Sequence, residues 1–127
     1  MKQVGSEQTL TAFAHEPNGG VIVTSGPLTA AYRGSIISAA NKYRLPAVYA
    51  YRYFSADGGL ASYGPDTIDV FSRAAAYVDR ILKGEKPTDL PVQAPTRYEL
   101  VINMRTARAI GLNLSPALLA RADEIIE

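Results

Sequence analysis

Two short apolar runs on either side of an amphipathic segment constrain the fold of this chain more than any other feature. The runs cover residues 20–24 and 46–51, and each is bounded by Gly or Pro and rich in β-branched or aromatic residues, which is typical of buried strands. The segment between them, residues 28–43, carries its apolar residues at helical spacing. A strand, a helix and a second strand in this order predict a βαβ unit with parallel strands, and therefore an α/β fold.

The loops that follow the two predicted strands are the first candidates for a functional site. Ligands of parallel α/β sheets bind beyond the carboxyl ends of the strands. In this sequence those ends lead into residues 25–27 and 51–59. The second loop holds the densest aromatic cluster of the chain, and tyrosine is suited both to packing on a sheet and to lining a pocket. Position alone leaves both interpretations open.

Composition excludes several classes of function. The 127 residues correspond to about one domain, and a net charge of +1 argues against an obligatory nucleic-acid partner. The absence of cysteine excludes disulfides, thiolate nucleophiles and cysteine-type zinc sites. The sequence has no His, Asp and Glu residues at the spacing of a metal site. It also has no glycine-rich phosphate loop of the kind that binds a nucleotide cofactor. We therefore expect neither metal nor cofactor.

The remaining segments predict further strands and helices. Residues 6–15 fit a short helix, 60–63 a third strand, 98–102 another strand and 104–110 a short helix. Two prolines keep residues 90–95 extended. A last helix begins with Ser115 and Pro116 and is expected to turn these residues inward: Leu118, Leu119, Ala122 and Ile125.

The clearest helix covers residues 66–83, with Asp66 as its N-cap and Gly84 at its end. Its apolar residues form two adjoining stripes, Ile68, Phe71, Ala75, Val78 and Leu82 beside Val70, Ala74, Tyr77 and Ile81. An apolar arc this wide exceeds what a helix covered on one side needs. We expect this helix to be covered on more than one side.

No group of residues predicts catalysis. His15, the single histidine, has no nucleophile or carboxylate at a telling spacing, so a surface or helix-end role explains it better. Asp57, Asp66 and Asp69 are explained by a turn and a helix start. We expect no catalytic residues and no enzymatic activity.

Six motifs in the same order over about 110 residues carry a resemblance to a known family. They are Arg44-Leu-Pro-Ala-Val-Tyr49, Gly58-Gly-Leu-Ala-Ser-Tyr-Gly64, Arg73-Ala-Ala-Ala-Tyr-Val-Asp-Arg-Ile-Leu-Lys-Gly84, Leu90-Pro-Val-Gln-Ala-Pro95, Tyr98-Glu-Leu-Val-Ile-Asn103 and Leu118-Leu-Ala-Arg-Ala-Asp-Glu124. In these motifs the chain resembles the C-terminal part of ABC-importer substrate-binding proteins related to aromatic amino-acid binders.

The resemblance implies a type I periplasmic-binding-protein fold, in which two α/β lobes close on a small ligand such as an amino acid. This chain would form a single α/β domain, residues 1–127, corresponding to the C-terminal lobe with a three-layer parallel sheet. Residues 1–62 and 90–127 would build the core of the lobe. Residues 64–84 would cross the hinge, so that the helix at about 66–83 packs on the missing lobe.

The same resemblance assigns the ligand-binding residues to the strand-end loops. They would be Ser25, Gly26, Pro27, Tyr51, Arg52, Tyr53, Phe54, Gly58 and Gly59. Residues 25–27 depart from the more acidic version of this loop in relatives, which often contains Asp-Pro, so an altered ligand or lost binding stays open. The ligand could be an aromatic or branched amino acid or another flat or apolar solute.

The expected partners are a small-molecule ligand and, for the full-length parent, an ABC permease in the periplasm. The N-terminus lacks the apolar region of a secretory signal, so the chain as written is expected to stay in the cytoplasm unless it belongs to a longer exported protein. With the other lobe absent, helix 66–83 predicts a homodimer or larger homo-oligomer. A stand-alone cytoplasmic oligomer with a structural or regulatory role, and a small flavodoxin-like enzyme, are the alternatives.

Overall fold

A computed structural model describes residues 10–14 and 18–127 of the chain. Residues 10–14 are helical, while the remainder of the predicted helix 6–15, including His15, lies outside the described residues. The chain divides into two units, one formed by residues 1–64 with 99–127 and one by residues 65–98. Each unit is described by itself below.

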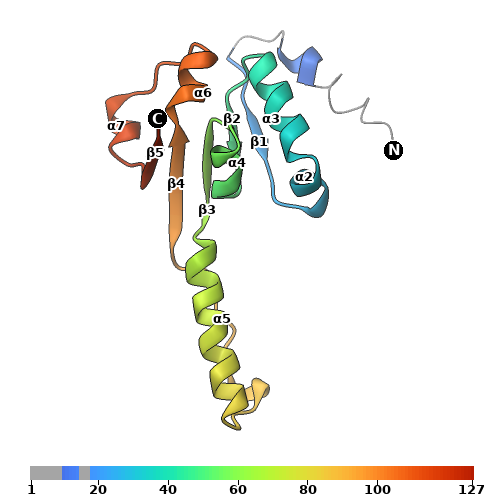
Figure 1. Cartoon of the computed structure of the whole chain (residues 1–127), viewed down its shortest axis with the longest axis vertical. Coiled ribbons are helices and arrows are strands. Elements are labelled where there is room, and N and C mark those ends of the chain that lie inside the picture. Colours follow the sequence, from blue (N-terminus) through green and yellow to red (C-terminus); the bar gives the residue numbers. More distant parts are fainter. Residues whose placement is uncertain (1–9, 15–17) are drawn as a thin grey trace. The chain divides into compact units, whose positions relative to one another are not determined.

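A five-stranded sheet organises the first unit, with its strands side by side in chain order (Figure 1). The strands are β1 (Val21–Val23), β2 (Ala47–Tyr49), β3 (Ala61–Pro65), β4 (Tyr98–Asn103) and β5 (Glu124–Ile126). The pairs β1–β2, β2–β3 and β4–β5 are parallel. The N–H of Asn103, at the end of β4, donates to the carbonyl of Leu60, just before β3, over 2.8 Å. The strands β3 and β4 therefore run in opposite directions, and the sheet is mixed.

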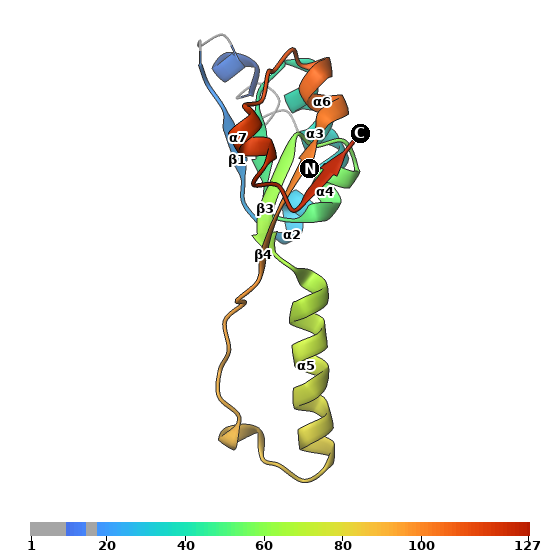
Figure 2. The ribbon, with the colours of Figure 1, turned by 90° about the vertical axis from the view of Figure 1, so that its left-hand side faces the viewer.

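Seven helical segments lie between these strands in the described chain. They are α2 (Pro27–Ala31), α3 (Arg33–Lys42), α4 (Arg52–Ala56), α5 (Thr67–Leu82), the 3₁₀ turn Pro87–Asp89, α6 (Met104–Ala109) and α7 (Pro116–Leu119). The helices α3 and α4 lie on the same side of the sheet (Figure 2). Between them and the strands lies the larger core cluster, formed by Val23, Ile37, Ala40, Ala47, Tyr49 and Phe54. A second cluster joins Leu60 to Ala107 and Ile110 of the α6 region.

The two faces of the sheet are covered unequally along its width. Val101 and Ile102 are successive residues of β4, so their side chains point to opposite faces, and both are fully buried. This part of the sheet thus has the three layers expected of an α/β fold. On β1 and β2, by contrast, Ile22 is 80% exposed and Val48 is 39% exposed on the face that α3 and α4 do not cover. That face of β1 and β2 meets no layer in the described chain.

The second unit consists of α5 and the chain that returns beside it. Asp66 caps α5 by accepting hydrogen bonds from the N–H groups of Ile68 and Asp69, as the sequence predicts. The hydroxyl of Tyr77 donates to the carbonyl of Pro91 over 2.6 Å. The guanidinium of Arg73 donates to the hydroxyl of Thr96 over 2.5 Å. The returning chain therefore lies along one side of α5, and no residue of α5 is buried.

Three sequence-based expectations about elements are wrong. Residues 51–59 are not one loop, because α4 occupies residues 52–56. The single helix expected over 28–43 is broken at Tyr32, whose ψ of 17° leaves the α-helical range and separates α2 from α3. The last predicted helix ends at Leu119, and Ile125 lies in strand β5 with 41% of its surface exposed. Each error involves a short element, since α2 and α4 have five residues, α7 has four and β5 has three.

Candidate functional site

The parallel pairing of β1 with β2 places two of the predicted loops at one edge of the sheet. Val23 lies beside Tyr49 in the register of this pair. The chain continues from these two residues to Ser25 and Tyr51, so both follow their strands at the carboxyl edge. This edge is where an α/β sheet offers a ligand site, and the structure brings the residues 25–27 and 51–53 to it.

The first loop is held in shape by Thr29, in the first turns of α2. Its hydroxyl lies 3.0 Å from the carbonyl oxygen of Thr24 and 2.9 Å from that of Gly26. Pro27 begins α2, where its fixed φ fits the first turn of a helix. Ser25 and Pro27 are exposed and Gly26 is half-buried, so the loop presents surface to solvent.

The second loop builds a stack of four aromatic rings that runs from the core to the surface. Tyr49 and Phe54 stack with ring centroids 5.0 Å apart, and Phe54 and Tyr53 with centroids 4.8 Å apart. Tyr51 stacks on Tyr53 at 5.6 Å. Tyr49 and Phe54 are each 1% exposed, whereas Tyr53 is 39% exposed. The inner rings therefore belong to the core, whereas the outer rings lie nearer the surface, and their role in lining a pocket stays a prediction.

Phe54 consequently differs from the other residues predicted at this site. Its ring is enclosed between Tyr49 and Tyr53 and offers no surface to a ligand in this structure. The physical reason is α4, because a helix of five residues turns the side chain of Phe54 back onto the sheet. Phe54 supports the position of Tyr53.

Gly58 and Gly59 lie at a different place from the other predicted residues. They follow α4 and precede β3, so they stand at the edge of the sheet where β3 begins. There the carbonyl of Gly58 accepts hydrogen bonds from the amide of Asn41 and from the hydroxyl of Thr106, over 3.0 Å and 2.8 Å. A Cβ on Gly59 would lie 2.6 Å from the ring of Tyr49. Close packing therefore explains Gly59, and a positive φ of 106° explains Gly58. The structure does not bring either glycine to Ser25 and Tyr51.

Two ion pairs fix the charged groups of this region. Arg52 makes a bidentate bond to the carboxylate of Glu124, with N–O distances of 2.7 Å and 2.6 Å. The hydrogen bond and the charge of Glu124 raise the pKa of Arg52 above its ordinary value. Arg33 donates to Asp57 over 2.5 Å, and its guanidinium lies 5.8 Å from the ring centroid of Tyr53. The outer ring of the stack thus has a cation beside it, which favours π-contacts.

Arg33, Glu124 and Tyr63 also lie in this region, and no local pattern in the sequence points to them. Arg33 lies in the amphipathic segment 28–43, and Glu124 lies 72 residues from Arg52 in the chain. Tyr63, near the carboxyl end of β3, is 59% exposed, and β3 is the neighbour of β2. The order of the strands would have pointed to Tyr63, but the sequence does not reveal which strands are neighbours.

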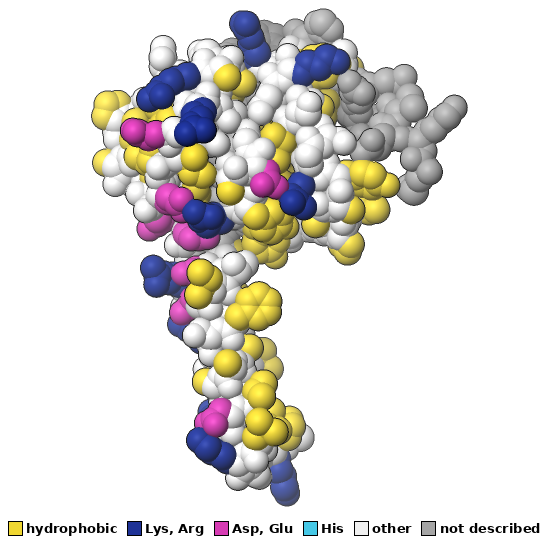
Figure 3. Space-filling model, viewed as in Figure 1, with side chains coloured by type: hydrophobic (Ala, Val, Ile, Leu, Met, Phe, Trp, Pro, Cys, Tyr) yellow, Lys and Arg dark blue, Asp and Glu magenta, His cyan; other side chains and the backbone are white. Residues whose placement is uncertain are grey.

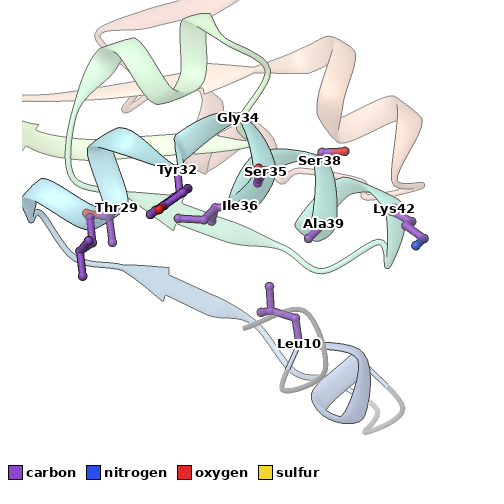
Figure 4. A pocket seen from close by; sticks show the side chains of 10 residues that line it. Leu10, Thr29, Tyr32, Gly34, Ser35, Ile36, Ser38, Ala39 and Lys42 are labelled. Atoms are coloured by element: carbon purple, nitrogen blue, oxygen red, sulfur yellow. The ribbon is translucent and has the colours of Figure 1, made fainter. Parts of the chain in front are cut away.

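A pocket of about 590 Å³ lies elsewhere, along α2 and α3 (Figure 4). Tyr32, Ile36, Ala39 and Lys42 line it, together with Leu10 of the short N-terminal helix. None of the residues predicted from the strand ends lines this pocket. It is therefore separate from the site that the carboxyl ends of the strands define.

The described residues contain no group of three or more His, Asp or Glu side chains that could hold a metal ion. Within the same residues, no helix is both long and apolar enough to cross a membrane.

The five-stranded sheet and the helices that connect its strands define an α/β fold. The profile of a family described as ABC transporter substrate binding protein matches residues 3–126. The chain belongs to this family. The resemblance that the six sequence motifs carry is thereby confirmed, as is the α/β binding-protein fold.

Solved structures agree with this assignment. A conserved domain protein from Vibrio cholerae O1 biovar El Tor is 30% identical, with a TM-score of 0.83 over 98% of this chain and 42% of that chain. An ABC domain from Streptococcus pneumoniae in complex with L-Trp is 24% identical, with a TM-score of 0.82 over 94% of this chain and 40% of that chain. A ligand-free, open substrate binding protein with adhesive properties from Clostridium difficile is 17% identical, with a TM-score of 0.68 over 99% of this chain and 42% of that chain.

This chain therefore spans about two fifths of the length of these structures. A comparison with curated proteins gave no match.

Proposed function

We propose that the chain is part of the solute-binding component of an ABC importer and binds a small molecule in a cleft between two lobes. The observation that carries the proposal is the register of β1 and β2, which brings Ser25 and Tyr51 to one edge of the sheet. Residues 1–62 and 99–127 of the predicted ranges would form the core of one lobe, and residues 64–84 would cross to the other; residues 90–98, predicted in the lobe core, belong to the unit that contains α5. Its partner would be an ABC permease, and the full-length parent would work in the periplasm.

The ligand we propose is an amino acid with an aromatic side chain. Tyr51 and Tyr53 present stacked rings at the edge of the sheet, and flat apolar solutes bind well to such surfaces. The ABC domain from Streptococcus pneumoniae with bound L-Trp supports the choice by its likeness of fold. Ser25, Gly26, Pro27 and Arg52 would complete the contribution of this lobe, with Arg52 held in place by Glu124. Gly59 would contribute indirectly through the packing of Tyr49, and Gly58 through the hydrogen bonds that its carbonyl accepts from Asn41 and Thr106.

The decisive experiment is isothermal titration of the full-length, two-lobed parent with L-Trp and other amino acids. Replacing Tyr53 or Tyr51 with Ala should weaken binding about 5- to 150-fold, since losing such an aromatic contact costs on the order of 1–3 kcal/mol. Tyr43→Ala is a matched control, because Tyr43 lies after α3, at the edge where β2 begins. Normal binding by both variants would show that the aromatic stack belongs to the core alone.

We also propose that this component performs no catalysis. Among residues 10–14 and 18–127, no nucleophile with a paired base lies at the edge of the sheet, and the carboxylates of Asp57 and Glu124 are bound to arginines. A turnover of any amino acid or amide by the purified parent, abolished by one substitution at His15, Asp57 or Asp66, would contradict this.

A second candidate function is self-association of the 127-residue chain through α5. The observation that favours it is the exposure of one face of the helix, where Ile68, Phe71 and Leu82 are 80%, 75% and 82% exposed. Apolar patches of this kind are unusual on soluble monomers. Sedimentation velocity over a range of concentrations would test it, and a monomer at every concentration would exclude it.

A further inference from the structure

One arginine of α3 contacts two side chains on the same side of α4. Tyr53 and Asp57 are four residues apart in the turn that ends α4, so their side chains are neighbours. Arg33, the first residue of α3, reaches both of them. Its Nε donates to the carboxylate of Asp57 over 2.5 Å, and its guanidinium carbon lies 5.8 Å from the ring centroid of Tyr53. Arg33 therefore joins the start of α3 to both ends of this turn.

The helix that carries Tyr53 is short and depends on such contacts. It has five residues, its N-cap Tyr51 makes no side-chain capping bond, and its first turn contains no acidic residue. Helices of this length are not stable by themselves in water. The N–H of Asp57, the C-cap, donates to the carbonyl of Tyr53 over 3.0 Å and closes the turn. Arg33 thus binds the residue that ends α4 and couples it to the longer helix α3.

The ring of Tyr53 is held by contacts at the surface as well as by the core. Phe54 below it is buried, whereas Tyr53 is 39% exposed. A side chain with this much exposed surface can change rotamer unless its neighbours hold it. The stacked rings of Tyr51 and Phe54 restrain it on the apolar side, and Arg33 adds the attraction between a cation and a ring. On the face of the sheet unit seen in Figure 3, acidic side chains lie next to basic ones, with hydrophobic side chains beside them.

We propose that Arg33 is a positioning residue of the ligand site: bound to Asp57, it holds the ring of Tyr53 in the orientation that an aromatic amino acid contacts. This inference rests on the proposed function and adds a residue that acts through Tyr53 without touching the ligand. The side chains of Arg33 and Asp57 are 48% and 44% exposed, so water screens the pair and it contributes little to the stability of the fold. Its effect should therefore appear in ligand binding and in the orientation of Tyr53.

Helix α5 offers a matched control for this arrangement. Arg80 donates to the carboxylate of Glu85, and its guanidinium carbon lies 5.8 Å from the ring centroid of Tyr77. The side chain of Arg80 is 45% exposed, close to the value for Arg33. The same three kinds of side chain thus meet at the same distance, but Tyr77 belongs to α5 and follows no strand end of the sheet. Arg80→Gln removes equivalent contacts away from the candidate site.

Calorimetric titration of the two-lobed parent with L-Trp is the first part of the test. Arg33→Gln keeps most of the side chain but removes its charge, and it should raise the dissociation constant about 3- to 10-fold, as expected for one exposed ion pair and one cation–π contact. Arg80→Gln should change the dissociation constant by less than about twofold. Because Arg33 acts through Tyr53, Arg33→Gln should cause no further loss in a Tyr53→Ala variant, whereas independent effects would multiply.

Fluorine NMR of the 127-residue chain is the second part and needs no ligand. With fluorotyrosine at position 53 alone, Arg33→Gln and Asp57→Asn should each shift or broaden the resonance, and Arg80→Gln should leave it unchanged. An unchanged resonance in both site variants, or an equal loss of L-Trp binding with and without Tyr53, overturns the positioning role. A fall in melting temperature of more than about 5 °C for Arg33→Gln also overturns it, because the residue would then be structural. If the natural parent binds no amino acid, the proposed function is overturned, while the resonance still decides whether Arg33 positions Tyr53.

Discussion

The hydroxyl of Tyr49 is an unpaired polar group in the core of the sheet unit. It has no hydrogen-bond partner within the described part of the chain, and burial raises the pKa of Tyr49 to about 12. An unpaired buried hydroxyl is destabilising, so Tyr49→Phe should leave the free energy of unfolding at pH 7 unchanged or raise it by up to about 1 kcal/mol. A loss of more than 1 kcal/mol in urea denaturation at pH 7 would show that the hydroxyl has a partner.

The same side chain predicts a difference at high pH. An unfolded tyrosine loses its proton near pH 10, and folded Tyr49 loses it near pH 12, so between these values the unfolded state binds fewer protons. The free energy of unfolding of the natural chain should therefore fall as pH rises from about 10 to about 12, by up to about 1.4 kcal/mol per pH unit from this residue. Tyr49→Phe should lack this contribution, and urea titrations of both chains at pH 9, 10 and 11 measure it. Equal slopes would contradict the prediction.

Gly64 is required by the close approach of two strands. A Cβ at this position would lie 1.8 Å from the carbonyl oxygen of Ala50, a distance that no rotamer can relieve. Gly64→Ala should therefore destabilise the chain by about 3 kcal/mol or more. Gly34→Ala is the control, because nothing lies within 4 Å of the added Cβ in α3, and it should stabilise by about 0.5–1 kcal/mol. Thermal denaturation of both variants measures the two effects. A similar change in melting temperature for both would show that the contact with Ala50 does not explain the glycine at position 64.

At the residue level, the sequence predicted the ends of the strands better than the contacts around them. Ser25 and Tyr51 could be placed because a strand end is readable from local composition. The separation of Gly58 and Gly59 depends on α4, and the pairing of Arg52 with Glu124 depends on contacts between distant parts of the chain. Neither leaves a local signal in the sequence.

Among the elements, β4 and α6 are joined to α4 by one buried side chain. The amide of Asn103 donates to the carbonyl of Ser55 over 2.9 Å and accepts from the N–H of Thr106 over 3.1 Å. Asn103→Ala leaves both groups unpaired in a buried site, so it should cost about 2–4 kcal/mol of stability. Ser115→Ala removes the exposed cap of α7 and should cost only about 0.5–1 kcal/mol. Similar losses for the two variants in chemical denaturation would contradict this role of Asn103.

The accuracy of the predicted elements follows their length. Helix α5, with 16 residues and a capping aspartate, was placed within about one residue of its observed ends, because period and cap agree. Helix α4 was missed because Arg52-Tyr-Phe-Ser-Ala56 is too short to show a period and its aromatic residues favour strands. Strand β5 was taken as the end of a helix, and it exists because it pairs with Val101–Asn103 of β4. Tertiary pairing, not local propensity, decides such elements.

At the scale of the whole molecule, unpaired surfaces occur in both units of the chain. Ile22 and Val48 are exposed on the uncovered face of β1 and β2, and Ile68, Phe71 and Leu82 of α5 are exposed in the second unit. The similar solved structures are more than twice as long as this chain. The sequence predicted the wide apolar arc of α5. The exposed face of β1 and β2 could not be predicted, because it becomes visible only once the pairing of the strands is known.

The sheet unit should fold without residues 67–96. The N–H of Asp66 donates to the carbonyl of Arg97, and the N–H of Asn103 donates to the carbonyl of Leu60, so Asp66 and Arg97 form a hydrogen-bonded pair in the antiparallel register of β3 and β4. A two-residue Asn-Gly turn can close such a pair. We expect the shortened chain to unfold cooperatively and to be monomeric, and its circular dichroism to lack the contribution of the 16 residues of α5. The core clusters contain no residue from 66–97, which is the physical reason for this expectation. A shortened chain without a cooperative thermal transition would show that α5 and the returning chain are needed to stabilise the sheet.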